Sequence, residues 1–385
     1  MKFIHTSDWH IGKRLNGQEL LEDQRVIFHR WIEEVATLDP DVVIIAGDLY
    51  DRALPSQDAV ELVDELFVKM SETFSCPVVV ISGNHDNGKR VGYGGYFFER
   101  QGIYMAGTPQ PQPKKVSVKD ADIYLLPFAY PATIRALYQE DTIKTVIDAT
   151  KRQVETIKSN WDPERLNLLV YHGSVSGQRG EEAGSDVETA GLHHLLSIGT
   201  VEFVPVSVFK EFDYVALGHI HRAQQIGEVA CYYSGSPMKY AKQEANQPKQ
   251  YLEVDLTKTH CQVTHHPITP VHDVRIVQGA FHELLQASPC YDYLYFELTD
   301  TTPQEEAMSR LRQVYPNAMS LSYVTTMALP DFQEMTTTDE TATPKNMTEL
   351  YRDFYQQMTG EALSPVQEEL LTETLATLAQ EEREQ

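Results

Sequence analysis

The sequence predicts an α/β protein, extended by a small α+β unit and then by helices at the C-terminus. Three observations support this prediction. Short apolar runs alternate with helical stretches in the first half, the pattern changes near residue 270, and a polar Thr-rich stretch precedes two final helical segments. Strands that alternate with helices imply layers in which helices cover much of the sheet.

The first half contains a strand at residues 2–5, followed by helices at 20–38 and 56–74, where apolar positions recur at helical spacing. Continuous β-branched or apolar runs predict four further strands, at residues 41–48, 76–86, 168–172 and 213–219. Such runs are typical of strands buried on both faces. Three later segments are expected to be consecutive antiparallel strands: 231–238, 249–256 and 261–268.

The second unit begins after residue 270 with a strand and helix at 274–286 and a strand at 291–300. A helix is expected at 303–316, after a Thr-Thr-Pro entry, and a strand at 320–329. The predicted division is therefore 1–270, 271–335, a linker at 336–344 and a helical segment at 345–385. Apolar positions form one stripe on the last helix: Val366, Leu370, Leu371, Leu375 and Leu378.

The composition of the 385 residues, 42% hydrophobic and 23% charged, is that of a globular protein. No apolar run approaches the length of a membrane span, and the N-terminus lacks the apolar region of a secretory signal. Four scattered cysteines without a CxxC pair favour a reducing cytoplasm. The net charge of −24 disfavours tight nucleic-acid binding by this chain alone, so a basic partner or a local basic surface would be needed.

Polar side chains follow each predicted strand of the first half, at its C-terminal end. They are Asp8 and His10, Asp48 and Asp51, Asn84, His85 and Asp86, His172, and His219 and His221. Ligands of α/β folds gather at the carboxyl ends of strands, so these five clusters are expected to converge.

The donor set of Asp8, His10, Asp48, Asn84, His172, His219 and His221 contains imidazole, carboxylate and one amide, without thiolate. It suits Mn²⁺, Fe or Zn²⁺, and Mn²⁺ is the expected metal. Seven donors are too many for one catalytic ion with an open position and about right for two ions that share a carboxylate. The glycines beside the donors would allow close backbone approach or unusual φ values.

The order D-x-H, GD-x-x-D, GNHD, HG, GH-x-H resembles the calcineurin-like metallophosphoesterases over roughly the first 270 residues. The resemblance implies a layered β-sandwich flanked by helices. It implies one ion on Asp8, His10, Asp48 and His221, and another on Asp48, Asn84, His172 and His219, with Asp48 as the bridge. It also implies that His85 stabilises the transition state or protonates the leaving oxygen, oriented by Asp51.

Longer stretches resemble the SbcD family: SDWHIGK, GDLYDR, GNHD, GHIHR and YYSGSPMKYAKQEANQPK. This resemblance implies an ATP-dependent exonuclease and endonuclease on DNA, working as a homodimer within a heterotetramer with an SbcC-type ATPase. It also implies that 271–335 is a capping domain and that 345–385 binds the coiled coil of the ATPase. Residues 240–244 depart from the family pattern, in which an aromatic residue or a Ser-Phe pair precedes the glutamate.

Several residues keep two interpretations. Lys89, Arg90 and Arg222 follow donor motifs and are expected to contact substrate phosphates, although a solvated loop is an alternative for each. Asp86 would order its loop rather than act chemically. A structural role is expected for the other histidines: His5, His29, His193, His194, His260, His265, His266, His272 and His282.

Two other functions remain open. A phosphatase acting on a small molecule or a protein would not need the α+β unit or the terminal helices. A non-catalytic scaffold would typically have lost donors, and none is missing from this sequence.

Overall fold

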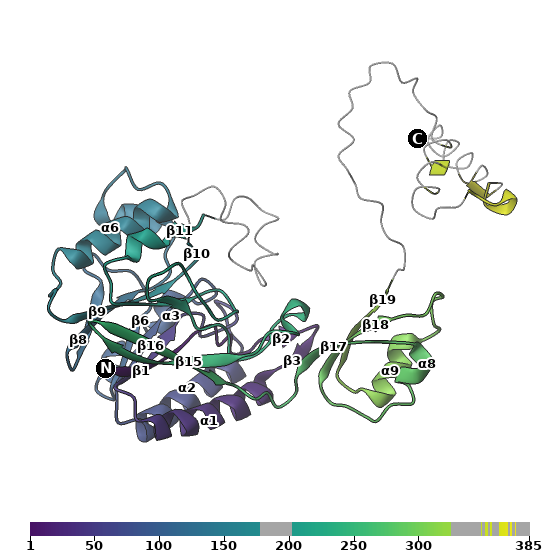
Figure 1. Ribbon diagram of the computed structural model, residues 1–385, viewed down its shortest axis with the longest axis horizontal. Coiled ribbons are helices and arrows are strands. Elements are labelled where there is room, and N and C mark those ends of the chain that lie inside the picture. Colours follow the sequence, from purple (N-terminus) through teal and green to yellow (C-terminus); the bar gives the residue numbers. More distant parts are fainter. Residues whose placement is uncertain are drawn as a thin grey trace, which may run out of the picture.

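The computed structural model describes residues 1–177 and 202–324, and beyond them only 348, 351–352, 355, 362–368, 370–371 and 374. Two six-stranded sheets pack face to face, and helices cover the outer face of each (Figure 1). One apolar cluster fills the space between the sheets. A second lies between the first sheet and its helices, and a third lies between the second sheet and its helices. The predicted layered α/β sandwich is confirmed.

The first sheet has the order β16-β15-β1-β4-β5-β6, with four parallel strands and two antiparallel strands at one edge. Its strands are β1 (Lys2–Thr6), β4 (Val42–Ala46), β5 (Val78–Ile81), β6 (Ile103–Ala106), β15 (Gln250–Thr257) and β16 (His260–Pro267). Because β4 and β5 are central and covered on both faces, every residue of both strands is buried, as their continuous apolar runs predict.

The second sheet has the order β13-β14-β12-β9-β8-β7. Its strands are β7 (Lys114–Val118), β8 (Ala121–Leu126), β9 (Leu166–His172), β12 (Tyr214–Gly218), β13 (Gln224–Gln225) and β14 (Cys231–Tyr233). The expectation that 231–238 pairs antiparallel with the next strand was wrong, because β14 runs parallel to β12 in this sheet. Tyr233 packs in the apolar cluster on the outer face of this sheet, and that burial places β14 here.

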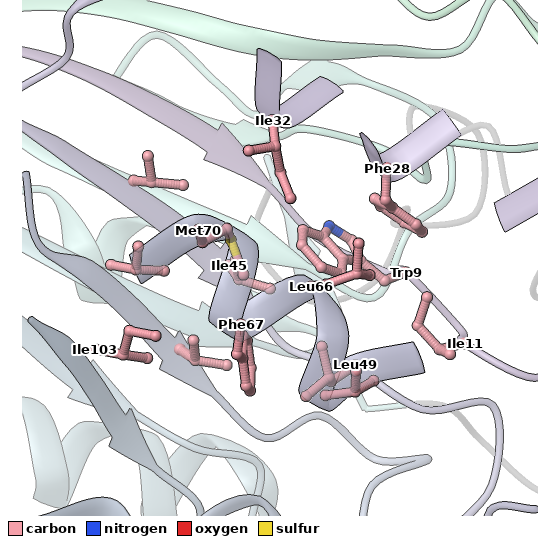
Figure 2. Packing of buried hydrophobic residues seen from close by; sticks show 14 of the residues in the cluster. Trp9, Ile11, Phe28, Ile32, Ile45, Leu49, Leu66, Phe67, Met70 and Ile103 are labelled. Carbon is pink, nitrogen blue, oxygen red and sulfur yellow. The ribbon is translucent and has the colours of Figure 1, made fainter. Parts of the chain in front are cut away.

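The helices α1 (Leu21–Leu38) and α2 (Gln57–Thr73) lie side by side against the first sheet and agree closely with the predicted ranges. The Ser56 hydroxyl accepts a hydrogen bond from the Ala59 amide and caps α2. Figure 2 shows Leu66, Phe67 and Met70 of α2 in the cluster that also contains Trp9 and Ile45.

Replacing Leu66 by alanine is expected to lower the free energy of unfolding by about 2–5 kcal/mol, because it leaves a cavity in this cluster. Val68 lies on the exposed face of the same helix, and Val68→Ala should change stability by less than about 0.5 kcal/mol. Thermal unfolding followed by circular dichroism compares the two variants. Equal melting temperatures would contradict the assigned packing.

The helix α6 (Val146–Lys158) covers the second sheet. Its N-terminus is capped by Thr145 and Asp148, whose side chains each accept a hydrogen bond from the other's backbone amide in a capping box. The remaining short elements of this body are α3 (Gly88–Val91), α4 (Gly95–Glu99), α5 (Pro131–Tyr138), η2 (Val206–Phe209), η3 (Lys242–Glu244), β2 (Arg14–Leu15), β3 (Gln18–Glu19), β10 (Val175–Ser176) and β11 (Val204–Pro205).

A smaller sheet of three parallel strands follows, β17 (Val274–Gly279), β18 (Tyr293–Leu298) and β19 (Ala318–Tyr323). The helices α8 (Phe281–Leu284) and α9 (Ala307–Val314) cover one of its faces. The helix predicted at 303–316 begins only at Ala307, because Glu306 before it adopts a left-handed conformation, with φ 48°. The predicted strand extends to residue 329, and its last part lies outside the described residues.

The other face of the small sheet packs against the main body (Figure 1). The apolar cluster at this contact combines residues of the small sheet, of the loop before η3, and of the segment from β2 to α1: Val274, Tyr293, Tyr295, Met319, Met238, Tyr240, Leu15, Leu20 and Ile27. The Tyr293 hydroxyl donates to the Asp23 carboxylate at 3.2 Å. The contact therefore joins the two units by both apolar packing and a buried hydrogen bond.

Some predicted features lie outside the described residues, namely the linker 336–344, Leu375, Leu378, His193 and His194. Val366 and Leu370 of the predicted stripe are described, and both are exposed. Among the described residues, no helix has the length and apolarity that crossing a membrane requires.

Candidate metal centre

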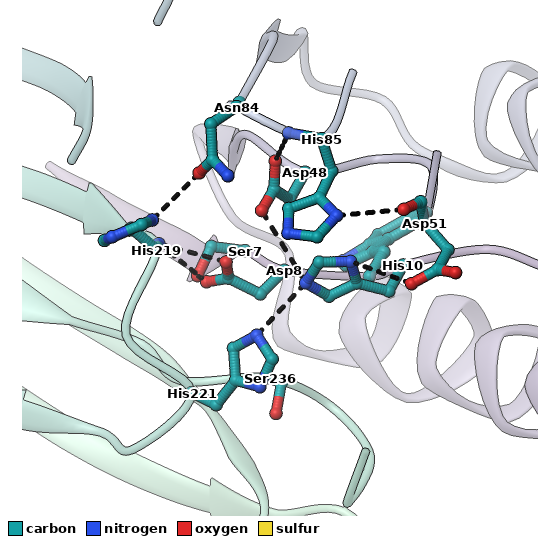
Figure 3. A network of polar contacts seen from close by, with 12 residues as sticks. Ser7, Asp8, His10, Asp48, Asp51, Asn84, His85, His219, His221 and Ser236 are labelled. Atoms are coloured by element: carbon teal, nitrogen blue, oxygen red, sulfur yellow. Dashed lines mark hydrogen bonds and ion pairs between the residues drawn. The ribbon is translucent and has the colours of Figure 1, made fainter. Parts of the chain in front are cut away.

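The polar clusters at the strand ends converge on one location between the two sheets (Figure 3). The first sheet contributes Asp8 and His10 after β1, Asp48 after β4 and Asn84 after β5. The second sheet contributes His172 at the end of β9, and His219 and His221 after β12. The structure thus brings together all seven predicted donors, from both sheets.

The backbone at four of these donors lies in the left-handed region. The φ values are 54° at Asp8, 45° at His10, 52° at Asp48 and 109° at His219. Side-chain-bearing residues adopt such φ values rarely, at a cost of roughly 1–3 kcal/mol each, and they concentrate at functional sites. A main-chain hydrogen bond of 3.0 Å from the His10 amide to the Asp48 carbonyl joins two of these left-handed residues.

One group of donors surrounds the imidazole of His10. Its Nε2 atom lies 3.0 Å from Nε2 of His221 and 3.6 Å from Oδ2 of Asp48. A carboxylate oxygen of Asp8 lies within 4.8 Å of the ligand atoms of His10 and His221. The four residues of the first predicted set therefore lie together, and their binding of an ion stays a prediction.

A second group surrounds the side-chain oxygen of Asn84. That oxygen lies 3.1 Å from Nε2 of His172 and 2.9 Å from Nδ1 of His219. The same His172 nitrogen lies 3.4 Å from Oδ2 of Asp48. Asp48 is therefore adjacent to both groups, as a bridging carboxylate must be.

These separations fit metal coordination. Bonds of about 2.0–2.2 Å from an ion to nitrogen or oxygen place neighbouring ligand atoms about 3.0–3.6 Å apart. The facing Nε2 atoms of His10 and His221 lie in that range, and a cation between them would use both lone pairs. The nitrogen and oxygen donor set suits Mn²⁺, Fe or Zn²⁺. The residues present therefore fit two divalent ions.

The protonation of the imidazoles agrees with this arrangement. Burial lowers the pKa of His219 to about 3 and that of His10 well below its ordinary value, so both are neutral, which is the form that binds metals. Burial would also lower the pKa of His172, but the carboxylates of Asp48 and Asp8 outweigh it and raise that pKa to about 9. A cation bound beside Asp48 would replace this proton.

Partners outside the donor set orient the donors. The Ser7 hydroxyl donates to Oδ2 of Asp8 at 2.5 Å, and Nδ1 of His172 donates to the Ala46 carbonyl at 2.8 Å. The second bond keeps the proton on Nδ1, so Nε2 of His172, which faces Asp48, is the nitrogen whose lone pair becomes available when a cation replaces its proton. Sequence reasoning missed both contacts, because no residue pattern indicates which carbonyl or hydroxyl will face a given side chain.

Glycine is required where the backbone passes close to the donors, as expected. A Cβ atom on Gly83 would lie 2.2 Å from Oδ1 of Asp48, and one on Gly47 would lie 2.3 Å from Nδ1 of His172. We expect Gly83→Ala to displace Asp48 and to reduce bound Mn²⁺ well below two ions per chain. Gly95→Ala should leave the metal content unchanged, because no atom lies within 4 Å of the added Cβ. Metal analysis of the purified variants tests this, and normal Mn²⁺ content in Gly83→Ala would contradict the geometry.

His85 lies at the exposed rim of the donor groups. Its amide donates to Oδ1 of Asp48 at 2.9 Å, and its Nδ1 donates to the main-chain carbonyl of Asp51, also at 2.9 Å. The contact with Asp51 is therefore made by the carbonyl and not by the carboxylate. The Asp51 carboxylate instead lies 2.8 Å from Nζ of Lys13 and 3.7 Å from Nδ1 of His10.

A third group of donor atoms combines His85, His10 and Asp51 within 4.8 Å. The ammonium group of Lys13 on Asp51 disfavours a cation at that point, because it already neutralises the carboxylate. His85 thus lies beside the donor groups and exposed to solvent.

The loop that contains His85 is ordered by Asp86, as expected. Its carboxylate accepts hydrogen bonds from the amides of Leu49, Tyr50 and Gly83. Lys89 and Arg90 follow on α3, where they are exposed and line a cavity of about 740 Å³ beside α2. Arg222 is exposed directly after His221. Phosphate contacts by these three residues stay a prediction.

The sandwich and its two donor groups define a calcineurin-like phosphoesterase. The family described as calcineurin-like phosphoesterase matches residues 1–223, and the type 5 capsule protein repressor C-terminal domain matches residues 270–359. A curated relative, the SbcD component of the nuclease SbcCD from Staphylococcus epidermidis, is 31% identical over 99% of this chain and 100% of its own length. The chain belongs to the SbcD family of calcineurin-like phosphoesterases.

Among solved structures, TT1561 of Thermus thermophilus is similar with a TM-score of 0.40 and 10% identity. The similarity covers 69% of this chain and 98% of that one. The family assignment rests on the sequence matches.

Proposed function

We propose that this chain is the nuclease component of an SbcCD-type complex, which hydrolyses DNA phosphodiester bonds as an exonuclease and endonuclease. In that complex it would process DNA ends, hairpins and breaks in repair and recombination, with ATP hydrolysed by the partner. The observation that carries the proposal is the pair of donor groups adjacent to Asp48, with the exposed His85 at their rim. The relative named as a nuclease matches the chain along its whole length, which supports DNA as the substrate.

The proposed ligands are those of the two groups, with Mn²⁺ as the physiological metal. Two bound ions supply Lewis acidity and a water of lowered pKa for in-line attack on phosphorus. The chain's own residues do the rest. Asp8 and Asp48 contribute negative charge that keeps divalent cations between the sheets, and Asn84 contributes a neutral oxygen.

His85 is the proposed general acid. The Asp51 carbonyl accepts a hydrogen bond from Nδ1 and so fixes the ring, and the residue is exposed at the rim. In its protonated state the imidazole delivers a proton to the leaving oxygen, a contribution of roughly 10²–10⁴-fold. Lys89, Arg90 and Arg222 are proposed to contact the phosphates that flank the cleaved bond.

The proposed partner is an SbcC-type ATPase that binds residues 345–385, with 271–335 as the capping domain and 336–344 as the linker. The exposed apolar side chains of Val366 and Leu370 are available for such a contact. The guanidinium of Arg352 donates two hydrogen bonds to the Glu368 carboxylate. Because the net charge of −24 disfavours tight DNA binding by this chain alone, the ATPase is proposed to supply much of the DNA-binding surface.

The proposed homodimer, within a heterotetramer, would use α2 and α4. Three exposed aromatic side chains lie on α4 or just before it, namely Tyr93, Tyr96 and Phe97, with 83%, 88% and 75% of their surface accessible. Tyr93 and Phe97 line the 740 Å³ cavity together with Val63 and Phe67 of α2. A contiguous exposed aromatic patch of this kind marks a protein interface.

Phe97→Glu is therefore expected to convert the dimer into monomers, because it places a charge in the apolar contact. Tyr130→Glu introduces the same charge at an exposed aromatic residue elsewhere and should leave the dimer intact. Sedimentation velocity separates these results. A wild-type monomer, or an intact Phe97→Glu dimer, would exclude this surface.

A cytoplasmic location is proposed because all four cysteines are unpaired, as in a reducing compartment.

The central experiment incubates the chain with its ATPase partner, ATP and Mn²⁺ on blunt duplex and hairpin DNA. Cleavage is expected, and omission of Mn²⁺ or ATP should abolish it. Hydrolysis of phosphate monoesters without DNA cleavage would favour a phosphatase, and inactivity on both would favour a scaffold. Deletion of the residues after 345 should abolish co-purification with the ATPase while metal content is unchanged. Retained co-purification would refute the partner assignment.

A further inference from the structure

A buried ion pair lies directly behind His221. Glu244 and Lys249 are 1% and 7% exposed, and Nζ of Lys249 lies 2.7 Å from Oε2 of Glu244. Burying two charges costs several kcal/mol per ion before their attraction is counted, and apolar side chains of similar size often stabilise a fold as well. A buried pair of this kind therefore points to a role other than stability.

Both members of the pair contact His221. Oε1 of Glu244 lies 2.9 Å from Nδ1 of the imidazole, and Nζ of Lys249 donates to the His221 carbonyl oxygen at 2.9 Å. A carboxylate only accepts hydrogen bonds, so Nδ1 carries the proton. Nε2 then presents its lone pair toward Nε2 of His10, 3.0 Å away.

The carboxylate of Glu244 is itself fixed. Its Oε2 atom also accepts a hydrogen bond from the Tyr240 amide at 3.1 Å, and Lys249 donates to the Ser236 hydroxyl at 2.9 Å. The turn η3 that carries Glu244 is joined to the small sheet by Lys242, whose Nζ lies 2.8 Å from the Glu297 carboxylate. His221 is thus oriented by a group that has little freedom to move.

We infer that Glu244, held in place by Lys249, is a positioning residue that fixes the tautomer and ring orientation of His221 for one of the two metal ions. The inference rests on the proposed metal centre and deepens it. A second partner that orients a ligating histidine typically contributes about 10–100-fold to metal affinity. The second ion, on Asn84, His172 and His219, should be unaffected, because the hydrogen bonds of these side chains run to one another and to the Ala46 carbonyl.

Calorimetric titration of the metal-free protein with Mn²⁺ tests the inference with Glu244→Gln. Glutamine has the same shape, but its NH₂ group must face either Nδ1–H of His221 or the ammonium of Lys249, which are both donors. One of two Mn²⁺ affinities should fall by about 10–100-fold and the other should stay unchanged. Gln243→Ala, at the exposed neighbouring position, is the matched control and should keep both affinities.

Unchanged affinities in Glu244→Gln, or equal weakening of both, would overturn the inference. Absence of Mn²⁺ binding by the wild type would overturn the metal centre itself, and this inference with it.

A second measurement does not depend on how the variant folds. In the ¹⁵N-histidine spectrum of the wild-type protein loaded with diamagnetic Zn²⁺, His221 should show a protonated, hydrogen-bonded Nδ1 and a metal-bound Nε2, assigned with His221→Asn. Coordination of Zn²⁺ through Nδ1, with the proton on Nε2, would overturn the inference.

Discussion

Asp48→Ala is expected to remove both metal ions and to abolish phosphoester hydrolysis. One oxygen of Asp48 lies 3.6 Å from Nε2 of His10 and 3.4 Å from Nε2 of His172, so each donor group loses its shared carboxylate. The other oxygen accepts the His85 amide, so the variant also frees the loop that carries the proposed acid. Metal ions contribute several kcal/mol to such reactions, which corresponds to at least about 10³-fold in rate.

The matched control is Asp255→Ala, which removes an exposed carboxylate from β15 of the same sheet. It should keep two ions per chain and full activity. Metal analysis, with rates measured on DNA and on bis(p-nitrophenyl) phosphate, compares the two variants. Two bound ions in Asp48→Ala would show that this carboxylate is not the bridge.

His85→Ala is expected to slow DNA cleavage by about 10²–10⁴-fold while both metal ions stay bound. The imidazole is exposed at the rim and is held by the Asp51 carbonyl, so its removal leaves the donor groups in place. Because an alkoxide leaving group needs a proton and p-nitrophenolate does not, the loss should be much smaller on bis(p-nitrophenyl) phosphate. His282→Ala, at an exposed histidine of α8, should behave as the wild type.

An equal loss on both substrates would contradict proton transfer by His85 and would indicate that the ring contacts the phosphate instead. Loss of metal from His85→Ala would place it among the ligands. The two outcomes are separated by metal analysis of the same preparation.

The sequence predicts most of the sandwich, because its central strands are covered on both faces and a strand buried in this way has a continuous apolar composition. The runs that became β4 and β5 contain almost only β-branched residues. The placement of β14 was not predictable in this way. Its three residues would suit either sheet, and beside β12 both Cys231 and Tyr233 are buried in the outer apolar cluster. The late start of α9 depends on the left-handed Glu306, for which the sequence offers no turn signal.

The convergence of the residues proposed as donors was predictable for a related reason. Each follows a strand whose end is defined by apolar composition, so the convergence of Asp8, Asp48 and His172 follows from topology. The contacts that orient the donors were not predictable. The Asp51 carbonyl on His85 and the Glu244 carboxylate on His221 depend on the path of loops, and a loop path is set by tertiary packing.

The donors come from both sheets, and this has a thermodynamic consequence for the sandwich. Asp8, Asp48 and Asn84 belong to one sheet, and His172 and His219 to the other, so the sheets cannot separate while an ion keeps ligands from both. Binding to the folded chain alone adds about 2.7 kcal/mol of stability when the free ligand is at 100 times its dissociation constant. Divalent metal would therefore act as a reversible cross-link between the layers, and chelation would lower the melting temperature of the main body before it changed the small sheet.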